Sequence, residues 1–189
     1  MKQRERTLLL VKPDGVTRGL IGECIGRFEQ RGFAICALKM IYATREQMSK
    51  HYLANAQNTE WLVRVGKNTL ESYEASGKDP QKELGTADPE KVGKLNIDWL
   101  VDFMTTGPIV AIVASGIGAV EMGRKIAGHT LPSRADIGSI RGDYSIDTPL
   151  LAALEKRPVK NIIHASGAVD EAEYEIACWF QKEELCTGA

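Results

Sequence analysis

A single histidine lies where a short apolar run gives way to a helical pattern. His164 follows Ile162 and Ile163, which predict a buried strand, and precedes Ser166, which predicts the N-cap of the next helix or a residue near it. Such a junction presents an imidazole to a cleft while the strand keeps its backbone still. His164 is therefore a candidate reactive residue, although this segment alone equally allows a hydrogen-bonded structural histidine.

A set of cationic, hydroxyl and amide side chains precedes that histidine, at the predicted ends of strands and helices. Lys12 and Asn161 fall at opposite ends of strands, while other members frame a loop rich in glycine and proline. Phosphate oxygens need convergent donors of this kind, because several hydrogen bonds must reach one anion. The sequence thus indicates a phosphate-binding site formed by Lys12, Tyr52, Arg124, Thr130, Arg141 and Asn161.

The composition is that of an ordinary globular protein. The chain has 189 residues, 43% of them hydrophobic, which is enough to bury a full core, and we expect one domain over residues 1–189. The formal net charge is -1 and the isoelectric point is about 6.3. The chain therefore has no positive field for a polyanion, and nucleic acid is not predicted as a partner.

The cysteines and the hydropathy predict a cytoplasmic protein. The four cysteines lack any Cys-x-x-Cys spacing, and Cys24 and Cys178 fall on apolar helix faces. Reduced core thiols are therefore expected rather than metal ligands, which suits a reducing compartment. No apolar run reaches the length of a membrane span, and the charged start leads into a strand rather than a secretory signal. We expect no membrane association.

Apolar periodicity predicts four strands with helices between them. Strands are expected at 7–11, 34–42, 109–114 and 162–163, with a turn over 12–15 that ends the first. Helices are expected from Leu20, from the capping-box pattern at Thr44, over 119–127 with Gly128 as its stop, and after Ser166. This order predicts an α/β sandwich. The compact solution is a ferredoxin-like βαββαβ core whose four-stranded antiparallel sheet is covered by helices.

Two segments look like insertions into that core. Residues 62–94 are polar and contain several glycines and prolines, so surface loops around short helices are expected, with a better-defined helix from Asp88-Pro89 onward. Residues 147–159 contain Thr148-Pro149, which predicts the start of a short leucine-rich helix. Both segments are expected at the surface, flanking the candidate site.

Ordered motifs along most of the chain carry a resemblance to a known family. They are Lys12-Pro-Asp-Gly-Val, Arg18-Gly-Leu-Ile-Gly, His51-Tyr52, Gly107-Pro-Ile-Val-Ala, Gly123-Arg124, Gly128-His-Thr130-x-Pro132, Ile140-Arg141-Gly-Asp and Asn161-Ile-Ile-His164. From Arg6 to Leu185, apart from the two insertions, the chain resembles nucleoside diphosphate kinases. The resemblance implies a ferredoxin-like fold and transfer of the terminal phosphoryl group of a nucleoside triphosphate to a nucleoside diphosphate. It also implies Mg²⁺ delivered with the nucleotide, no metal ligands from the chain itself, and a homo-oligomer, a tetramer or hexamer built from dimers.

The same resemblance implies a role for each site residue. His164 corresponds to the nucleophile that becomes a phosphohistidine in a ping-pong reaction, which suits an imidazole with an ordinary pKa of about 6.5. Glu175 corresponds to the carboxylate that fixes the histidine tautomer. The remaining residues correspond to nucleotide contacts: Arg124, Thr130 and Arg141 to the outer phosphates, Tyr52 to another phosphate contact, and Lys12 and Asn161 to the ribose hydroxyl and the transferring phosphate. The aromatic residue that stacks on the base in the family aligns here only with a shift, and Trp61 is the best candidate for it.

One position departs from the family pattern. Gly167 stands where the family usually has an aspartate after the serine, and that aspartate is a candidate outer contact of the metal. The details of Mg²⁺ dependence are therefore expected to differ.

Two other classes of protein fit parts of the sequence. Gly116-Ile-Gly118, between a predicted strand and a helix, mimics the dinucleotide fingerprint of an oxidoreductase, but Glu121 occupies the position of the third glycine. A catalytically idle binding or scaffold protein on the same fold is the second alternative, because a fold does not guarantee activity. The intact set of His164, Lys12 and Arg141 argues against it.

Overall fold

The computed structural model describes residues 4–186, which divide into two compact units. The first unit comprises residues 4–43, 107–146 and 161–186, and the second comprises 44–106 and 147–160. The second unit is thus formed by two separate stretches of chain, and each of them is flanked in the sequence by segments of the first unit.

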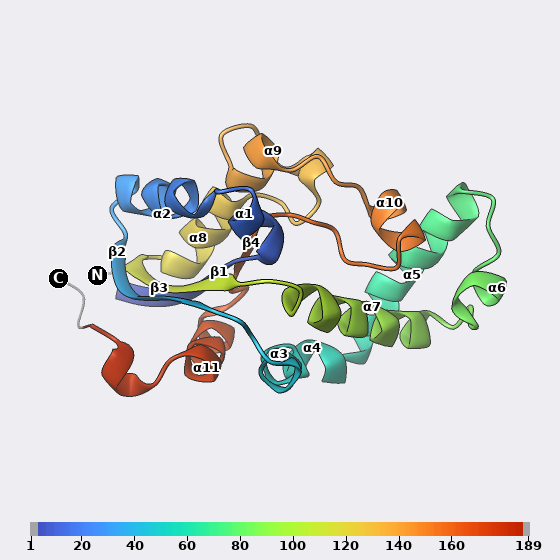
Figure 1. Ribbon diagram of the computed structural model, residues 1–189, viewed down its shortest axis with the longest axis horizontal. Coiled ribbons are helices and arrows are strands. Elements are labelled where there is room, and N and C mark those ends of the chain that lie inside the picture. The colour runs from blue at the N-terminus through green and yellow to red at the C-terminus, as the bar shows by residue number, and fades with distance from the viewer. Residues whose placement is uncertain (1–3, 187–189) are drawn as a thin grey trace. The chain divides into compact units, whose positions relative to one another are not determined.

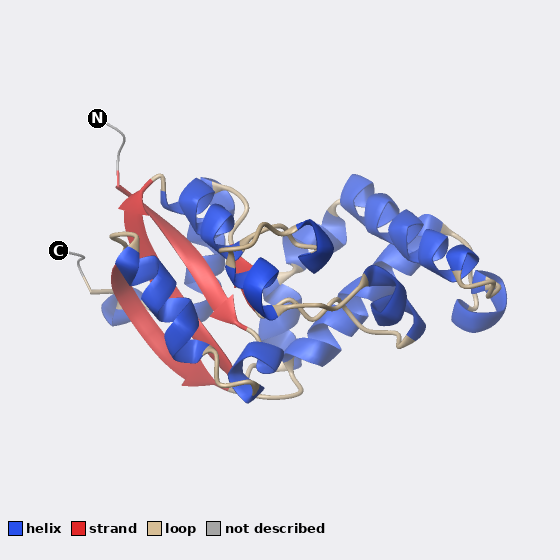
Figure 2. Ribbon diagram, turned by 90° about the horizontal axis from the view of Figure 1, so that it is seen from above, coloured by secondary structure: helices blue, strands red, loops and turns tan. Residues whose placement is uncertain are grey.

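The first unit contains a four-stranded sheet (Figures 1 and 2). Its strands are β1 (Arg4–Val11), β2 (Ala34–Ile41), β3 (Ile109–Ile117) and β4 (Ile163–Ala165). They lie in the order β2-β3-β1-β4, and each neighbouring pair is antiparallel. This arrangement confirms the predicted ferredoxin-like core.

Helices cover both faces of this sheet, with α2 and α8 on one face and α11 on the other (Figure 1). The helices and turns of the unit are α1 (Pro13–Thr17), α2 (Ile21–Gln30), α8 (Ala119–Ala127), the 3-10 turn η1 (Pro132–Arg134), α9 (Ile140–Tyr144), α11 (Val169–Trp179) and the 3-10 turn η2 (Lys182–Glu184). Helix α8 has the predicted limits, and Gly128 follows it with a φ of 88°. A positive φ suits glycine, which stops the helix there.

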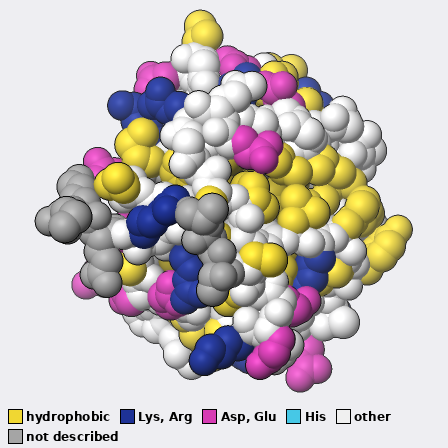
Figure 3. Space-filling view, turned by 90° about the vertical axis from the view of Figure 1, so that its left-hand side faces the viewer, with side chains coloured by type: hydrophobic (Ala, Val, Ile, Leu, Met, Phe, Trp, Pro, Cys, Tyr) yellow, Lys and Arg dark blue, Asp and Glu magenta, His cyan; other side chains and the backbone are white. Residues whose placement is uncertain are grey.

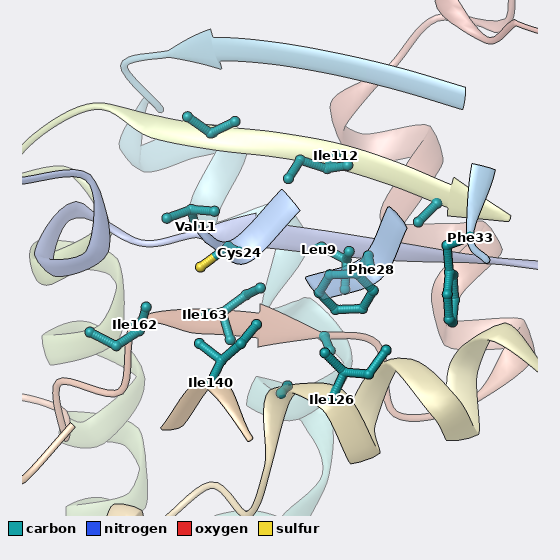
Figure 4. Close-up of a cluster of buried hydrophobic side chains, with 14 of the residues drawn as sticks. Leu9, Val11, Cys24, Phe28, Phe33, Ile112, Ile126, Ile140, Ile162 and Ile163 are labelled. Atoms are coloured by element: carbon teal, nitrogen blue, oxygen red, sulfur yellow. The ribbon is translucent and has the colours of Figure 1, made fainter. Parts of the chain in front are cut away.

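The main core lies between the sheet and helices α2 and α8 (Figure 4). Leu9 and Ile112 reach it from the central strands, Phe28 from α2 and Ile126 from α8. Burying a side chain of this size stabilises the fold by about 1.5–3 kcal/mol relative to leaving it exposed. Strands β1 and β3 have helices on both faces, which is why they read as continuous apolar runs in the sequence.

The turn predicted over residues 12–15 is wrong, because this segment begins helix α1. Pro13 takes the first helical position, and Lys12 is the N-cap. Proline has no N–H to leave unbonded at a helix start, so it fits this position as well as a turn. The consequence is that Lys12 and Asp14 have fixed backbones directly after the central strand β1.

The second unit consists of helices. They are α3 (Arg45–His51), α4 (Leu53–Gln57), α5 (Thr59–Ala75), α6 (Pro80–Leu84), α7 (Pro89–Met104) and α10 (Pro149–Leu154). The predicted caps of three of them are confirmed: Thr44 accepts from the Gln47 N–H, Asp88 from the Glu90 N–H, and Thr148 from the Leu151 N–H.

The surface loops predicted within residues 62–94 are wrong, because most of the first half of this segment belongs to the 17-residue helix α5. Helix α5 packs tightly against α7 through two glycines. A Cβ at Gly66 would lie 1.8 Å from the Pro89 carbonyl oxygen, and one at Gly93 would lie 2.2 Å from the Leu62 carbonyl oxygen. These glycines permit helix contact and do not mark turns.

The two segments predicted as insertions pack against each other in this unit. The Tyr73 hydroxyl on α5 donates a buried hydrogen bond of 2.8 Å to the Ala153 carbonyl on α10. The Lys156 ammonium donates to the Glu83 carbonyl at 2.9 Å. The two segments are therefore one structural feature rather than two. Across residues 4–186, no helix has the length and apolar character that crossing a membrane requires.

Candidate active site

His164 lies in the edge strand β4, opposite Leu10 of β1. Its side chain is 19% exposed, and its Nε2 lies 2.9 Å from Oε1 and 3.1 Å from Oε2 of Glu175. A carboxylate can only accept, so Nε2 carries a proton in this contact. The strand and the carboxylate together thus fix the position and orientation of the imidazole.

Glu175 is itself held in place by a third side chain. It lies on α11 with 3% of its side chain exposed, and the Ser166 hydroxyl donates to its Oε2 at 2.6 Å. Ser166 Oγ also accepts from the Leu8 N–H of β1 at 3.1 Å. The N-cap of α11 is Ala168, so Ser166 lies two residues before it, which agrees with the predicted place near the cap. From there Ser166 connects the carboxylate to the central sheet.

Three of the predicted phosphate-site residues form a hydrogen-bonded chain. The Lys12 ammonium, 7% exposed, donates to Asn161 Oδ1 at 2.7 Å, and Asn161 Nδ2 donates to the Thr130 carbonyl at 2.8 Å. Burial is the main cause that lowers the pKa of Lys12 to about 8, the positive charge of Arg141 lowers it further, and Asp14 partly offsets both. Lys12 is therefore a desolvated cation suited to an anion.

Arg141 is a second buried cation, on the short helix α9. Its Nη1 donates to the Gly128 carbonyl at 2.6 Å, and its Nη2 donates to the Ile163 carbonyl, next to His164, at 2.7 Å. Its Nε is buried, and no acceptor for it lies within residues 4–186. Burial, and then the charge of Arg124, lower the pKa of Arg141 to about 10. The unpaired N–H and uncompensated charge suit an incoming anionic oxygen.

Arg124 lies in the last turn of α8, close to the loop that follows His164. Its Nη1 lies 3.6 Å from the position that a Cβ at Gly167 would take. The Gly167 N–H donates to Glu171 Oε2 at 2.7 Å, and that Cβ would lie 2.5 Å from the same oxygen. The Glu171 carboxylate therefore lies over the position where the family usually has an aspartate side chain.

The first unit thus brings together seven of the predicted site residues: Lys12, Arg124, Thr130, Arg141, Asn161, His164 and Glu175. The other two predicted residues, Tyr52 and Trp61, belong to the second unit. Tyr52 is the C-cap of α3, with its ring edge against His51 at a centroid distance of 4.7 Å, and Trp61 lies in the first turn of α5.

The predicted site residues do not include two residues that support this site. One is Ser166, whose hydroxyl binds Glu175. The other is Asp14, whose Oδ2 accepts the Ile162 N–H at 3.0 Å. Asp14 is far from Ile162 in the sequence, so only the pairing of β1 with β4 reveals the contact.

Comparisons with known proteins agree with this geometry. A sequence model of the family described as nucleoside diphosphate kinase matches residues 5–65 and 87–185. A nucleoside diphosphate kinase from Pyrobaculum aerophilum is 49% identical over 181 residues, which are 96% of this chain and 97% of that protein. One from Pyrococcus furiosus is 37% identical and covers 98% of this chain and 88% of its own length.

Solved structures give the same result. The crystal structure of an NDP kinase from Pyrobaculum aerophilum superposes with a TM-score of 0.91 and 47% identity, covering 97% of this chain and all of the other. A transition-state mimic of the nucleoside-diphosphate kinase from Borrelia burgdorferi superposes with a TM-score of 0.76 and 29% identity, over 97% of this chain and 91% of that one. This chain belongs to the nucleoside diphosphate kinase family, whose members are phosphotransferases acting on nucleotides.

Proposed function

We propose that His164 carries the phosphoryl group between the two nucleotides. In the first half-reaction, His164 Nδ1 attacks the terminal phosphorus of a nucleoside triphosphate, the bond from that phosphorus to the bridging oxygen breaks, and the diphosphate leaves. An acceptor diphosphate then attacks the phosphohistidine and restores the imidazole. The observation that carries this proposal is the hydrogen bond from His164 Nε2 to buried Glu175, because it fixes the lone pair on Nδ1.

The cations of the first unit fit the charge that moves in this reaction. Phosphoryl transfer needs positioned positive charge more than covalent chemistry, and Lys12, Arg141 and Arg124 supply it beside His164. Asn161 is bonded to the Lys12 ammonium and to the Thr130 carbonyl, so it fixes the positions of these two groups relative to each other. The Borrelia burgdorferi structure, which has vanadate and ADP bound, supports a nucleotide site on this fold.

The roles of the other predicted contacts rest on the resemblance. Tyr52 is proposed as a further phosphate contact and Trp61 as the residue against the base. Mg²⁺ is proposed to arrive as part of the nucleotide substrate, where it bridges phosphate oxygens and shields their charge.

The test is phosphoprotein formation. Incubation with ATP and Mg²⁺, without acceptor, is expected to leave one acid-labile, alkali-stable phosphate per chain, and GDP should then discharge it as GTP. His164→Ala should carry no label, whereas His129→Ala, which removes an exposed histidine, should keep it. Label that persists in His164→Ala, or an acid-stable phosphate, would exclude this histidine as the nucleophile.

We also propose a homo-oligomer built from dimers through strand β2. This strand lies at one edge of the sheet, and Leu38, Met40 and Tyr42 expose 50%, 55% and 76% of their surfaces. Figure 3 shows hydrophobic side chains gathered among charged ones on one face of the molecule. An exposed edge strand with apolar side chains favours pairing with another strand, and a second copy of the chain supplies an identical one.

A reducing, cytoplasmic location is proposed from the cysteines. None of the four forms a disulfide within residues 4–186, and burial raises the pKa of the Cys24 thiol to about 12, so it packs as an inert core residue.

A further inference from the structure

Ile162, two residues before His164, has an unusual backbone. Its φ is 71°, a left-handed conformation that β-branched residues rarely adopt, and its side chain is 1% exposed. The Ile163 N–H donates across it to the Asn161 carbonyl at 2.8 Å, which closes a three-residue γ-turn. This turn sets the directions of Asn161 on one side and His164 on the other, so its geometry matters to the site.

Both backbone groups of Ile162 are held by the start of α1. The Lys12 N–H donates to the Ile162 carbonyl at 2.8 Å, and the Ile162 N–H donates to Asp14 Oδ2 at 3.0 Å. Strained conformations persist only where their surroundings hold them. Gly15 lets this helix approach, because a Cβ there would lie 3.0 Å from the Ile162 carbonyl oxygen.

Asp14 also has an oxygen that the hydrogen bond does not use. Its Oδ1 is buried and has no partner among residues 4–186. An asparagine would accept the same N–H without a buried negative charge, so the hydrogen bond alone does not account for a carboxylate. The charged groups that act on Lys12 are Arg141, which disfavours its ammonium form, and Asp14, which favours it. The negative charge therefore opposes the repulsion between two buried cations.

We propose that Asp14 is a positioning residue for phosphoryl transfer, which holds the Ile162 γ-turn through Oδ2 and compensates the charge of Lys12, the cation next to Arg141. The proposal rests on the proposed function, in which His164 is the nucleophile. Asp14 does not touch the reacting atoms, and it acts through the His164 backbone and the Lys12 ammonium.

Two substitutions separate the two parts of this role. Asp14→Asn keeps an acceptor for the Ile162 N–H but removes the charge, so the pKa of Lys12 should fall below its value of about 8. The pH dependence of kcat/KM reports ionisations of the free enzyme, so the decline of kcat/KM with rising pH should begin at a lower pH in Asp14→Asn than in wild type. We expect little difference between the two proteins near pH 6.5 and a loss of about threefold or more at pH 8.5.

Asp14→Ala removes both the acceptor and the charge, and it should also slow single-turnover phosphorylation of His164 about tenfold or more at every pH. Glu29→Gln, which removes an exposed carboxylate from α2, is the control for net charge and should match wild type.

The outcomes distinguish the possibilities. A purely structural role would lower the denaturation midpoint of both variants but leave their pH profiles superimposable on wild type, and this result would overturn the proposal. If Asp14→Ala does not fold, the profile of Asp14→Asn still decides. Failure of the proposed function would show differently, because wild-type protein would then form no phosphohistidine.

Discussion

At the scale of single residues, several candidate catalytic side chains also hold the backbone of the site. Arg141 bonds two main-chain carbonyls, and Ser166 bonds the main chain of β1 as well as Glu175. The same side chains thus serve the proposed phosphate site and hold the main chain around it in place. Substitution at such a residue should change stability together with activity, in contrast to substitution at a residue that only reaches the ligand.

The two arginines provide a direct comparison. Arg141→Ala leaves the part-buried Gly128 carbonyl and the buried Ile163 carbonyl without their donors, so we expect a loss of about 3 kcal/mol in the free energy of unfolding in addition to a fall of about 10²-fold in kcat/KM. Arg124 is exposed, and Arg124→Ala should lower kcat/KM similarly with unchanged stability. Urea denaturation and steady-state kinetics measure both. Equal stability of the two variants would contradict the structural role of Arg141.

Ser166→Ala tests the orientation of Glu175. The substitution leaves Glu175 Oε2 without its 2.6 Å donor, so the carboxylate holds the His164 tautomer less firmly. We expect the rate of phosphohistidine formation to fall roughly tenfold, with little change in nucleotide KM. Rapid-quench measurement gives that rate. Ser166→Thr keeps a hydroxyl and should restore much of it, and a Thr variant as slow as the Ala variant would argue against the hydrogen bond.

The candidate reactive side chains are easier to find in the sequence than the residues that support them. His164 and Lys12 stand out because charged or titratable residues at the ends of apolar runs are unusual. Asp14 and Ser166 each bond the backbone of a residue far away in the sequence, at separations of 148 and 158 residues. Local patterns carry no information about these two contacts before the strand pairing is known.

At the scale of elements, glycine has two different structural roles in this chain: it ends a helix, or it allows two helices to pack closely. Gly128 has a positive φ and ends α8, as predicted. Gly66 and Gly93 lie inside helices and allow two backbones to touch. A composition rich in glycine and proline predicts loops in both cases, so it misled the prediction for residues 62–94. The central strands β1 and β3 were predicted well, because their apolar runs are dictated by burial on both faces. The prediction of the last strand over 162–163 is wrong at its start, because Ile162 has a φ of 71° and β4 comprises Ile163–Ala165.

Gly93→Ala measures how close that helix contact is. Alanine favours a helix over glycine by about 1 kcal/mol, but here its Cβ would lie 2.2 Å from the Leu62 carbonyl oxygen. Overpacking against backbone costs about 1–3 kcal/mol, so we expect net destabilisation, seen as a lower midpoint in thermal unfolding. Gly26→Ala in α2 is the matched control, since the nearest atom to its Cβ is a side-chain nitrogen at 3.9 Å. That variant should be as stable as wild type or more so.

At the scale of the whole molecule, the edge strand β2 determines the expected assembly. Met40→Lys places a charge in the middle of the exposed apolar row of this strand, where a partner strand would bury it. We expect the mass measured by light scattering to fall toward that of a single chain. Tyr174→Lys, at a residue 39% exposed on α11, is the control and should keep the wild-type mass. Unchanged mass for Met40→Lys would place the subunit contact elsewhere.

The buried hydrogen bond from Tyr73 to Ala153 has a consequence for the order in which the protein is made. The two residues are 80 positions apart, and ribosomes add about 5–20 residues per second, so α5 is synthesised roughly 4–16 s before its partner α10. The interval between the synthesis of β1 and that of β4 is longer still, since Leu9 pairs with Ala165. Nascent chains that stop before Ala153 should therefore expose the Tyr73 side of α5 to proteases and chaperones. The two units should each close only after α10 and β4 have left the exit tunnel, when His164 also reaches its strand.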